Sequence, residues 1–405
     1  MKPWLSVVGI GEEGLAGLAP VGRALVETAE VLVGGARHHE MVPQASAERL
    51  LWERPFDRTI EAIAERRGRN VTVLASGDPL WYGVGVTLAG RFPPDEMTIV
   101  PQPSAFSLAA ARLGWSVAGC LTITLHGRPL DTLRLYLAPG RQILALSEHG
   151  DTPRAVAQLL TRLGWGPSRL VVLAHLGGKR EAVFKEEAQS WSDRQVPALN
   201  TIAIACRSAP GARVLPLFSG LPDDAFDHDG QLTKREVRAA TLAALAPLPG
   251  ETLWDVGAGC GSIAIEWLRA GDGRSAVAIE RSATRAAVIA RNASSLGVPG
   301  LRVIAGAAPG ALDGLPVPDA IFAGGGIGEP GLLPLLWARL RPGGRLVANV
   351  VTAEGEARLL DWHMGYGGTL TRIAVSRAEP VGAHRLWRSL APVTQLAVSK
   401  PERDA

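Results

Sequence analysis

Cysteine is scarce in this 405-residue chain, where Cys120, Cys206 and Cys260 stand far apart. Three cysteines this far apart in the sequence form neither the pattern of a disulfide framework nor a CxxC metal site. We therefore expect no bound metal and a reducing, cytoplasmic location. Long apolar runs are also missing, since no stretch approaches the roughly 18 residues of a membrane-spanning helix. The N-terminus becomes acidic and glycine-rich after a few apolar residues, too early for a signal-peptide core. Secreted and membrane proteins are therefore disfavoured.

An excess of charge of one sign is absent as well. The 42 Lys and Arg residues against 39 Asp and Glu leave a net charge of +3, and no long basic arm or repeat gathers the cations. This pattern disfavours a protein that coats nucleic acid. Glycine, in contrast, is abundant: the 47 glycines lie mostly in short clusters between apolar runs, which is typical of many tight strand-to-helix turns.

The first half of the chain has an alternating α/β pattern. Short β-branched or leucine-rich runs are separated by longer stretches of helical period, which favours parallel sheets. The predicted strands are 5–9, 31–35, 71–77, 97–101, 142–147, 169–177 and 201–206. After Cys206 the pattern breaks into a stretch rich in Pro, Gly and Asp, residues 207–230, which we interpret as the domain boundary.

A second α/β series follows this break. Its predicted helices are 233–246, 262–270, 283–297 and 331–341, and its predicted strands are 251–257, 275–280, 301–306, 319–325 and 345–351. The order is that of a doubly wound sheet. We therefore expect a first domain at residues 1–212, a linker and leading segment at 213–232, and a second domain at 233–405.

The strongest motif occupies the first strand-to-helix turn of the second series. Strand LWDVG runs into a GAGCG turn and then a helix, so bare backbone and free helix N–H groups face any ligand there. The next strand ends in Glu280, nineteen residues past Gly261, where a carboxylate can accept both hydroxyls of a ribose. Strand, glycine turn, helix and acidic strand end together predict a nucleoside site.

This arrangement resembles the class I S-adenosylmethionine (SAM) methyltransferases, because an acid precedes the first glycine and the GxGxxG spacing of nicotinamide enzymes is missing. The resemblance implies that Glu280 holds the ribose and that the turn carries the methionine part of SAM. The turn residues are Gly257, Ala258, Gly259, Cys260 and Gly261. Asp255 either orders the turn or serves as a plain turn or capping residue.

Residues 9–14, GIGEEG, form a literal GxGxxG after the first strand. A dinucleotide site is nevertheless disfavoured here, because the second strand ends in Gly34 and Gly35 with no acid for a ribose. Glu12 and Glu13 would also repel a pyrophosphate at the helix start.

Four motifs of the first half occur in a specific order. They are VVGIGEEG, VGGARHH at 33–39, LASGDPLWYG at 74–83 and PQPSAFSLAAARLGW at 101–115. In this order they resemble the tetrapyrrole methylases, the class III SAM enzymes, which fold as two α/β lobes around SAM. The resemblance implies cofactor contacts at Gly77, Asp78, Pro79, Ser104 and Ala105, with the 9–14 loop on the tetrapyrrole side.

The chain thus resembles a class III tetrapyrrole methylase fold fused to a C-terminal class I Rossmann-like domain, a combination found among enzymes of cobalamin biosynthesis. The resemblance implies SAM-dependent methylation of precorrin-6B at C5 by the first half and at C15 by the second. It also implies loss of the ring C acetate carboxyl to give precorrin-8, two SAM sites and a homo-oligomer. In the second half it adds SAM contacts at Thr233, Ala307 and Ala308.

The substrate carries many carboxylates, so cationic side chains should rim both sites. Candidates are Arg37, His38, His39, Lys179, Arg180, Lys234, Arg235, Arg377, His384, Arg385 and Arg388. No catalytic acid or base is assigned. Two alternative functions are an RNA methyltransferase and a nicotinamide oxidoreductase. The first is disfavoured because the sequence has no Asn/Asp-Pro-Pro-aromatic loop and no basic stripe interleaved with aromatic residues.

Overall fold

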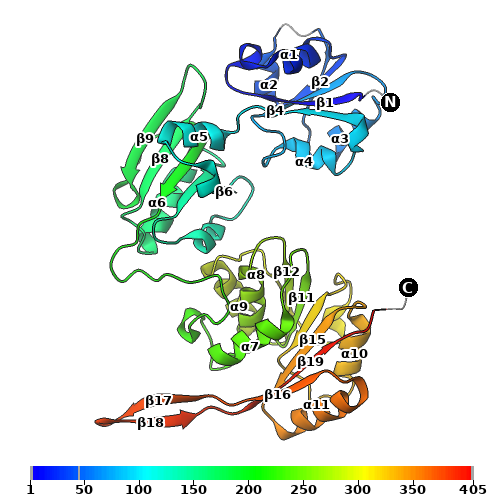
Figure 1. The fold of residues 1–405 in the computed structure, drawn as a ribbon, viewed down its shortest axis with the longest axis vertical. Helices are drawn as coiled ribbons and strands as arrows, with labels where there is room; N and C mark the ends of the chain where they lie inside the picture. Colours follow the sequence, from blue (N-terminus) through cyan, green and yellow to red (C-terminus); the bar gives the residue numbers. More distant parts are fainter. Residues whose placement is uncertain (1–2, 44–45, 403–405) are drawn as a thin grey trace. The chain divides into compact units, whose positions relative to one another are not determined.

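The computed structural model describes residues 3–43 and 46–402, which form two compact units (Figure 1). The first unit comprises residues 1–130 and 137–213, and the second comprises residues 131–136 and 214–405. Both are mixed α/β structures. Among the residues described, no helix has the length and apolar character needed to cross a membrane.

The N-terminal sheet of the first unit is parallel throughout, with strand order β3-β2-β4-β1-β5. Its strands are β1 (Leu5–Ile10), β2 (Val31–Gly34), β3 (Glu48–Leu51), β4 (Val71–Ser76) and β5 (Met97–Val100). Four helices accompany it: α1 (Pro20–Glu27), α2 (Ala36–Met41), α3 (Asp57–Ala64) and α4 (Val84–Ala89). Alternate strand residues enter two separate apolar cores, one containing α1 residue Val26 and the other α3 residue Ile60.

The second sheet of the first unit has strand order β6-β7-β10-β8-β9. Its elements are α5 (Ala105–Leu113), β6 (Leu121–Thr124), β7 (Gln142–Leu146), α6 (Thr152–Arg162), β8 (Arg169–Ala174), β9 (Ala182–Glu187) and β10 (Asn200–Ala205). The expectation of a parallel sheet is wrong here, because β10 runs antiparallel to both β7 and β8, and β9 is antiparallel to β8. Apolar runs that are buried on both faces look alike in parallel and mixed sheets, so the pattern could not distinguish them.

One seven-stranded sheet, of order β13-β12-β11-β14-β15-β19-β16, dominates the second unit. Its strands are β11 (Thr252–Val256), β12 (Ser275–Glu280), β13 (Arg302–Ala305), β14 (Ala320–Ala323), β15 (Arg345–Val350), β16 (Thr369–Ile373) and β19 (Val393–Ser399). Its helices are α7 (Arg235–Leu245), α8 (Ser262–Arg269), α9 (Ala283–Ser295), α10 (Leu332–Arg339) and α11 (Ala353–Tyr366). The predicted helices and strands of both series are confirmed to within a few residues at each end.

The seven-stranded sheet is covered by helices on both faces (Figure 1). Successive residues of β11 show how: Leu253 enters the core formed with α7, α8 and α9, whereas Trp254 enters the core formed with α10 and α11. Strand order reverses between β11 and β14, since β12 lies on one side of β11 and β14 on the other. Ligands of open α/β sheets bind at the carboxyl ends of strands at such a reversal.

The sequence pattern missed the antiparallel C-terminal part of the second unit. Strand β19 pairs antiparallel with β15 and β16, and β17 (Ser376–Val381) pairs with β18 (His384–Ser389) in a separate hairpin. The hairpin extends away from the rest of the unit (Figure 1), and every residue of β18 is exposed. Its polar, arginine-containing strands carry little of the apolar alternation from which strands are recognised.

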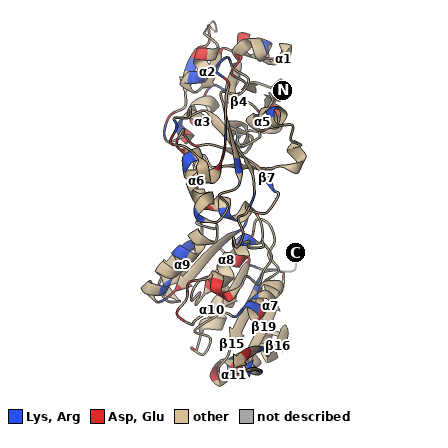
Figure 2. Cartoon of the chain, turned by 90° about the vertical axis from the view of Figure 1, so that its left-hand side faces the viewer, with Lys and Arg blue, Asp and Glu red and all other residues tan. Residues whose placement is uncertain are grey.

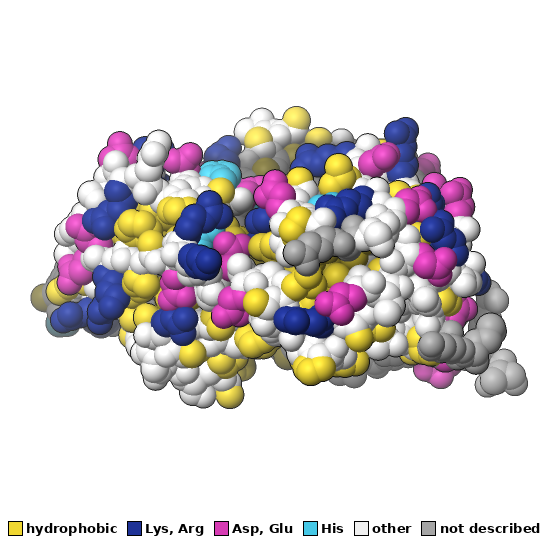
Figure 3. All heavy atoms as spheres, turned by 90° about the horizontal axis from the view of Figure 1, so that it is seen from above, with side chains coloured by type: hydrophobic (Ala, Val, Ile, Leu, Met, Phe, Trp, Pro, Cys, Tyr) yellow, Lys and Arg dark blue, Asp and Glu magenta, His cyan; other side chains and the backbone are white. Residues whose placement is uncertain are grey.

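Residues of both charge signs are mixed along both units (Figure 2). The face shown in Figure 3 likewise presents basic, acidic and apolar side chains next to one another. Many are paired across elements, as in the contacts of Arg66 with Glu48 and Arg112 with Glu181. These observations agree with the interspersed charges of the sequence.

Candidate functional site

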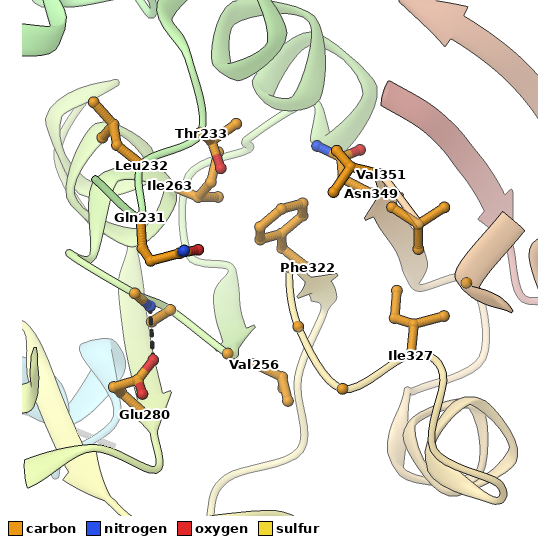
Figure 4. Close-up of a pocket in the computed structure, with 18 of the residues that line it drawn as sticks. Gln231, Leu232, Thr233, Val256, Ile263, Glu280, Phe322, Ile327, Asn349 and Val351 are labelled. Carbon is orange, nitrogen blue, oxygen red and sulfur yellow. Dashed lines mark hydrogen bonds between the residues drawn. The ribbon is translucent and has the colours of Figure 1, made fainter. Parts of the chain in front are cut away.

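A cavity of about 760 Å³ opens at the carboxyl ends of the parallel strands of the second unit. The turns after β11, β12, β13, β14 and β15 line it, together with the segment that leads into α7. In Figure 4, Gln231 and Thr233 lie on one side of this space, with Phe322 and Ile327 across from them. The volume falls in the range of about 300 to 1,000 Å³ that is usual for small-molecule sites.

Most of the cofactor contacts predicted for the second half line this cavity. They are Thr233, Gly257, Ala258, Gly259, Cys260, Glu280, Ala307 and Ala308. Gly261 is not among the lining residues. A Cβ at Gly261 would lie 2.7 Å from Cγ2 of Ile289, so this glycine lets α8 and α9 approach closely. The structure therefore brings residues from four separate turns to one space.

The glycine turn presents bare backbone to the cavity. Gly257 has φ +74°, and a Cβ built there would lie 2.8 Å from the backbone nitrogen of Gly325, in the turn after β14. Neither the backbone angle nor the available space accepts a side chain. The result is a cradle whose shape suits a ligand that lies directly against the main chain, as the nucleoside prediction requires.

Glu280 is held rigidly at the end of β12 and is only 4% exposed. One carboxylate oxygen accepts the N–H of Gly259 at 2.9 Å (Figure 4), and the other accepts the N–H of Ser282 at 3.0 Å. Each carboxylate oxygen has further lone pairs, so both can still accept a hydroxyl from a ligand. This arrangement fits a ribose diol lying beside the glycine turn.

Asp255 lies behind the turn and is not part of the cavity wall. Its Oδ2 accepts the N–H of Ala264 in the first turn of α8 at 3.0 Å, whereas its buried Oδ1 has no partner among the described residues. Burial, reinforced by the nearby Glu280 carboxylate, raises the pKa of Asp255 to about 7. Of the two roles expected for this residue, its bond to an N–H group in the first turn of α8 corresponds to the capping role.

Cys260 is buried in the same turn, and its carbonyl oxygen accepts the Nδ2–H of Asn292 at 3.0 Å. Burial raises the pKa of the Cys260 thiol to about 11. The thiolate is the nucleophilic form, so this cysteine is unreactive near neutral pH. Its buried side chain therefore serves the packing of the turn.

A buried ion pair, which the sequence interpretation missed, anchors the segment that leads into α7. Arg238 is fully buried and donates to Glu266 Oε1 at 2.6 Å and to the carbonyl oxygen of Thr233 at 2.5 Å. Glu266 in turn accepts the N–H groups of Gly220 and Leu221 at 2.6 and 2.9 Å. The pair therefore holds Thr233 at the cavity and anchors Gly220 and Leu221, at the start of the segment that leads into α7.

The far wall of the cavity is largely apolar, with Phe322, Ile327 and Val351 (Figure 4). Asn349 is a polar residue on this wall, and Thr241 and Gln395 fix its orientation. Asn349 donates to Thr241 Oγ1 at 2.8 Å, and Gln395 donates to Asn349 Oδ1 at 2.9 Å. An apolar wall with one oriented amide suits a large, flat, conjugated ligand.

In the first unit, the loops after β1, β4 and β5 pack tightly on one another. A Cβ at Gly9 would lie 2.0 Å from the carbonyl oxygen of Gly77, and one at Gly77 would lie 3.1 Å from Cα of Ser104. Asp78 Oδ1 accepts the N–H of Leu80 at 2.8 Å, which tightens the Gly-Asp-Pro turn. The structure thus brings the predicted contacts of residues 77–79 and of Ser104 together.

Ser104 and Ala105 also have a local structural role. Ser104 is the N-cap of α5, since its Oγ accepts the N–H of Ser107 at 3.1 Å, and Ala105 is the first residue of that helix. Side-chain caps of this kind satisfy helix N–H groups that would otherwise lack partners. One lone pair of the Ser104 hydroxyl is therefore used by the helix, and its Oγ also lies 3.0 Å from Oγ of Ser107.

Beside these loops, Glu12 joins the two sheets of the first unit. It forms an ion pair with Arg37, and its Oε2 lies 2.9 Å from Nδ1 of His175. Burial raises the pKa of Glu12, but the hydrogen bond to His175 and the positive charge of Arg37 outweigh it and hold the pKa below its usual value. Glu12 is thus neutralised by cations rather than exposed to a ligand, which the sequence did not indicate.

Most of the candidate cations have clearly different surroundings. Arg37, His38 and Arg180 surround Glu12 and Ser76. Lys234 lines the cavity of the second unit, whereas Arg377 is paired with Asp223 and Glu236. His39 is buried with its Nε2 on the carbonyl oxygen of Leu50, and His384, Arg385 and Arg388 lie on the exposed strand β18.

Comparison with known proteins covers both units. Residues 5–190 match the family of tetrapyrrole (corrin/porphyrin) methylases, and residues 224–400 match the precorrin methyltransferase domain. A protein of Sinorhizobium sp named precorrin-6Y C(5,15)-methyltransferase (decarboxylating) is 49% identical over 401 residues. That match covers 99% of this chain and 97% of the relative.

Two shorter proteins of Salmonella typhimurium are also similar to parts of this chain. A cobalt-precorrin-7 C(5)-methyltransferase is 30% identical over 179 residues, covering 44% of this chain and 88% of its own length. A cobalt-precorrin-6B C(15)-methyltransferase (decarboxylating) is 30% identical over 176 residues, covering 42% of this chain and 90% of its own length.

Proposed function

The chain belongs to the precorrin-6Y C5,15-methyltransferase (decarboxylating) family, and from this premise we propose that each unit binds one SAM and transfers one methyl group. The observation that carries the proposal is the cavity of about 760 Å³ between a bare glycine turn and the apolar wall around Phe322. The glycine turn offers bare backbone to a nucleoside, and the wall around Phe322 offers an apolar surface in the same cavity. The two shorter relatives, each covering less than half of this chain, agree with a division of labour.

We assign methylation at C15 and decarboxylation to the second unit, residues 233–405, which we take to be a class I SAM methyltransferase domain. In this assignment Glu280 accepts the ribose hydroxyls. The main chain of Gly257, Ala258, Gly259 and Cys260 holds the methionine part, with further contacts from Thr233, Ala307 and Ala308. Since Ala307 has no carboxylate, the adenine amino group is met by backbone.

We assign methylation at C5 to the first unit, residues 1–212, as a class III domain. Gly77, Asp78 and Pro79 then contact the cofactor together with the Ser104–Ala105 turn, and the loop at 9–14 faces the tetrapyrrole. The tight packing of Gly9 on Gly77 supports this, because it places the two loops against each other. A homo-oligomer and a cytoplasmic location remain predictions of the family resemblance.

When bound, SAM supplies a strongly electrophilic methyl group. The protein then has to align it with a nucleophilic bridge carbon and exclude water, and no nucleophilic side chain is needed. The carbon that accepts the methyl group gives up a proton, whereas the acetate that loses carbon dioxide gains one. The apolar wall at Phe322, Ile327 and Val351 suits the decarboxylation, because a desolvated carboxylate loses carbon dioxide more readily when a conjugated system can accept the electrons.

Mass spectrometry of a reduced precorrin after incubation with the full chain and SAM tests the proposal. We expect a gain of two methyl groups with loss of carbon dioxide. Asp78→Ala is expected to block only the methylation at C5, and Glu280→Ala only the methylation at C15 with the decarboxylation. An unchanged tetrapyrrole in the presence of bound SAM would refute the substrate assignment.

A further inference from the structure

Ser76 is the last residue of β4 and directly precedes the Gly-Asp-Pro turn of the first unit. Strand β4 lies between β2 and β1 in a parallel sheet, so Ser76 stands at the carboxyl edge where ligands of such sheets bind. Ser76 is exposed to solvent. A polar group placed here is therefore within reach of a ligand at the proposed cofactor loop.

The hydrogen bonds of His38 determine which of its ring nitrogens carries the proton. The N–H of Gly35 donates to Nδ1 at 3.3 Å, so the ring proton resides on Nε2. Nε2 lies 3.0 Å from Ser76 Oγ and donates to it. Burial, followed by the charge of Arg37 and by His39, lowers the pKa of His38 to about 4, which keeps this neutral form at neutral pH.

Arg37 supplies a second donor to the same oxygen, with Nη2 2.6 Å from Ser76 Oγ. A serine oxygen has two acceptor lone pairs, and both are now used. The O–H of Ser76 must then point toward a third group. Among residues 3–43 and 46–402, the hydrogen bonds of Ser76 Oγ are these two, and neither partner accepts its proton.

The guanidinium of Arg37 is the charged group that bonds directly to this hydroxyl. Arg37 keeps 35% of its side chain exposed while its other arm is paired with Glu12. The guanidinium of Arg180 lies 3.9 Å from the same carboxylate, and His175 bonds to it as well. One carboxylate is thus shared by two arginines. An outward O–H donor beside a partly exposed guanidinium matches the oxygens of a carboxylate.

We propose that Ser76 and Arg37 form a carboxylate subsite that holds one acidic side arm of the tetrapyrrole next to the cofactor loop of the first unit. The identity of the ligand rests on the proposed function, whereas the preference for a carboxylate follows from the donors themselves. The subsite orients the macrocycle from one side, so that a bridge carbon rather than a ring edge faces the cofactor loop.

Three variants of the full chain test the subsite. Ser76→Ala removes only the hydroxyl, Ser76→Thr keeps it, and Arg37→Gln removes the charge. The matched control is Arg91→Gln, which breaks an exposed ion pair with Asp57 elsewhere in the same unit. We expect Ser76→Ala and Arg37→Gln to raise KM for the tetrapyrrole in the methylation at C5 about tenfold. SAM affinity and kcat should stay within about twofold of wild type, and Ser76→Thr should restore KM.

A binding titration that does not depend on turnover uses a stable oxidised porphyrin with acetate and propionate side chains, followed by its fluorescence. Ser76→Ala and Arg37→Gln should weaken its binding to the full chain, whereas Arg91→Gln should not. If wild type methylates no precorrin, the proposed function fails and this titration alone decides the subsite. Unchanged porphyrin affinity or unchanged KM in both variants overturns it, and so does a loss of SAM affinity in Ser76→Ala.

Discussion

The two units place glycine-rich loops at the carboxyl edge of parallel strands, but they hold those loops in different ways. In the second unit, the side chain of Glu280 ties the turn together by accepting the N–H groups of Gly259 and Ser282. In the first unit, the main chain does this work, since Gly9 lies directly against the carbonyl of Gly77. A comparable cradle can therefore be built around a carboxylate or around close backbone packing.

The buried carboxylates of the two units show the same contrast. Glu280 is surrounded by backbone N–H donors and keeps lone pairs for a ligand. Glu12 is surrounded by the guanidinium groups of Arg37 and Arg180 and by the imidazole of His175. Glu12 follows the end of β1 and Glu280 is the last residue of β12, and of these two Glu280 lines the cavity of the second unit. Whether a carboxylate is able to bind a ribose therefore depends on which groups already bond to it, and not on burial alone.

The largest difference between the two units is expected from Glu280→Ala, because the second unit holds its turn through this side chain. Removing the carboxylate deletes the two proposed hydrogen bonds to ribose hydroxyls and frees the Gly259 and Ser282 N–H groups, so we expect a loss of about 4 kcal/mol, or roughly a thousandfold, in SAM affinity of the second unit. Isothermal titration calorimetry should find one SAM site left. The exposed Glu354→Ala serves as control and should keep two sites. Two sites of unchanged affinity in Glu280→Ala would contradict the assignment.

Arg238→Met tests whether the second unit depends on its buried ion pair. The substitution leaves Glu266 buried without a cation, so we expect a loss of about 3 to 5 kcal/mol in the free energy of unfolding of this unit. Calorimetry should show its transition moving down while the transition of the first unit stays. Arg377→Met, whose side chain is 38% exposed, should cost no more than about 1 kcal/mol. Equal shifts in both variants would show that the pair is not needed.

A matched pair of alanine substitutions tests whether the glycine-rich loops of the two units act separately. Gly257→Ala forces an alanine into φ +74° against Gly325, and Gly9→Ala drives a Cβ into the Gly77 carbonyl. Each should lower one methyl transfer about a hundredfold, at C15 and at C5 respectively. Mass spectrometry with limiting enzyme separates the two products.

The controls for this pair are Gly300→Ala, where a Cβ meets nothing within 4 Å, and Gly119→Ala, whose nearest neighbour would be 3.7 Å away. Both should retain both transfers. If Gly9→Ala lowered the transfer at C15 as strongly as the transfer at C5, the two cradles would not act separately.

The smallest predicted difference is in the pH dependence of stability. Asp255 has a pKa of about 7 when folded against 3.8 as a free group, so the folded second unit retains a proton that the unfolded chain has lost. Its stability should fall as pH rises from about 4 to 7. His38 has a pKa of about 4 when folded against 6.5, so the unfolded chain binds the proton first. The stability of the first unit should rise as pH rises from about 4 to 6.5.

Each group contributes a slope of about 1 kcal/mol per pH unit within its window. Calorimetry between pH 4.5 and 7 should resolve the two transitions, with Asp255→Asn and His38→Gln as the variants that remove one contribution each. The variant-minus-wild-type difference isolates each group from the other carboxylates. Slopes that do not change in either variant would show that neither group titrates with folding.

Local features of the site could be predicted because they depend on neighbours in the chain. The glycine turn after β11 and Glu280 at the end of β12 follow from strand, turn and helix patterns that short windows contain. Arg238 and Glu266 could not be paired in this way. Each lies in a predicted helical stretch where a charge normally indicates a solvated face, and only packing of α7 on α8 buries them together.

The same limit applies to Asn349 and to Ser76. Asn349 is oriented by Thr241 and Gln395, which lie 108 and 46 residues away, and Ser76 is met by donors 39 and 38 residues earlier. None of these spacings follows a helical or strand period. Their chemistry arises from side chains that converge only when the sheets are assembled.

By itself the sequence determined most strands and helices, the glycine turns and the acidic strand end, because each depends on backbone conformation and on the alternation of apolar residues. It missed β3, β6, β9 and the elements after β15. Only the tertiary structure decided that the sheet of β6 to β10 is mixed, that Glu12 is neutralised and that Arg238 is buried. Strand direction and the pairing of charges are set by packing between distant segments, where desolvation and hydrogen bonding act on groups that the sequence keeps apart.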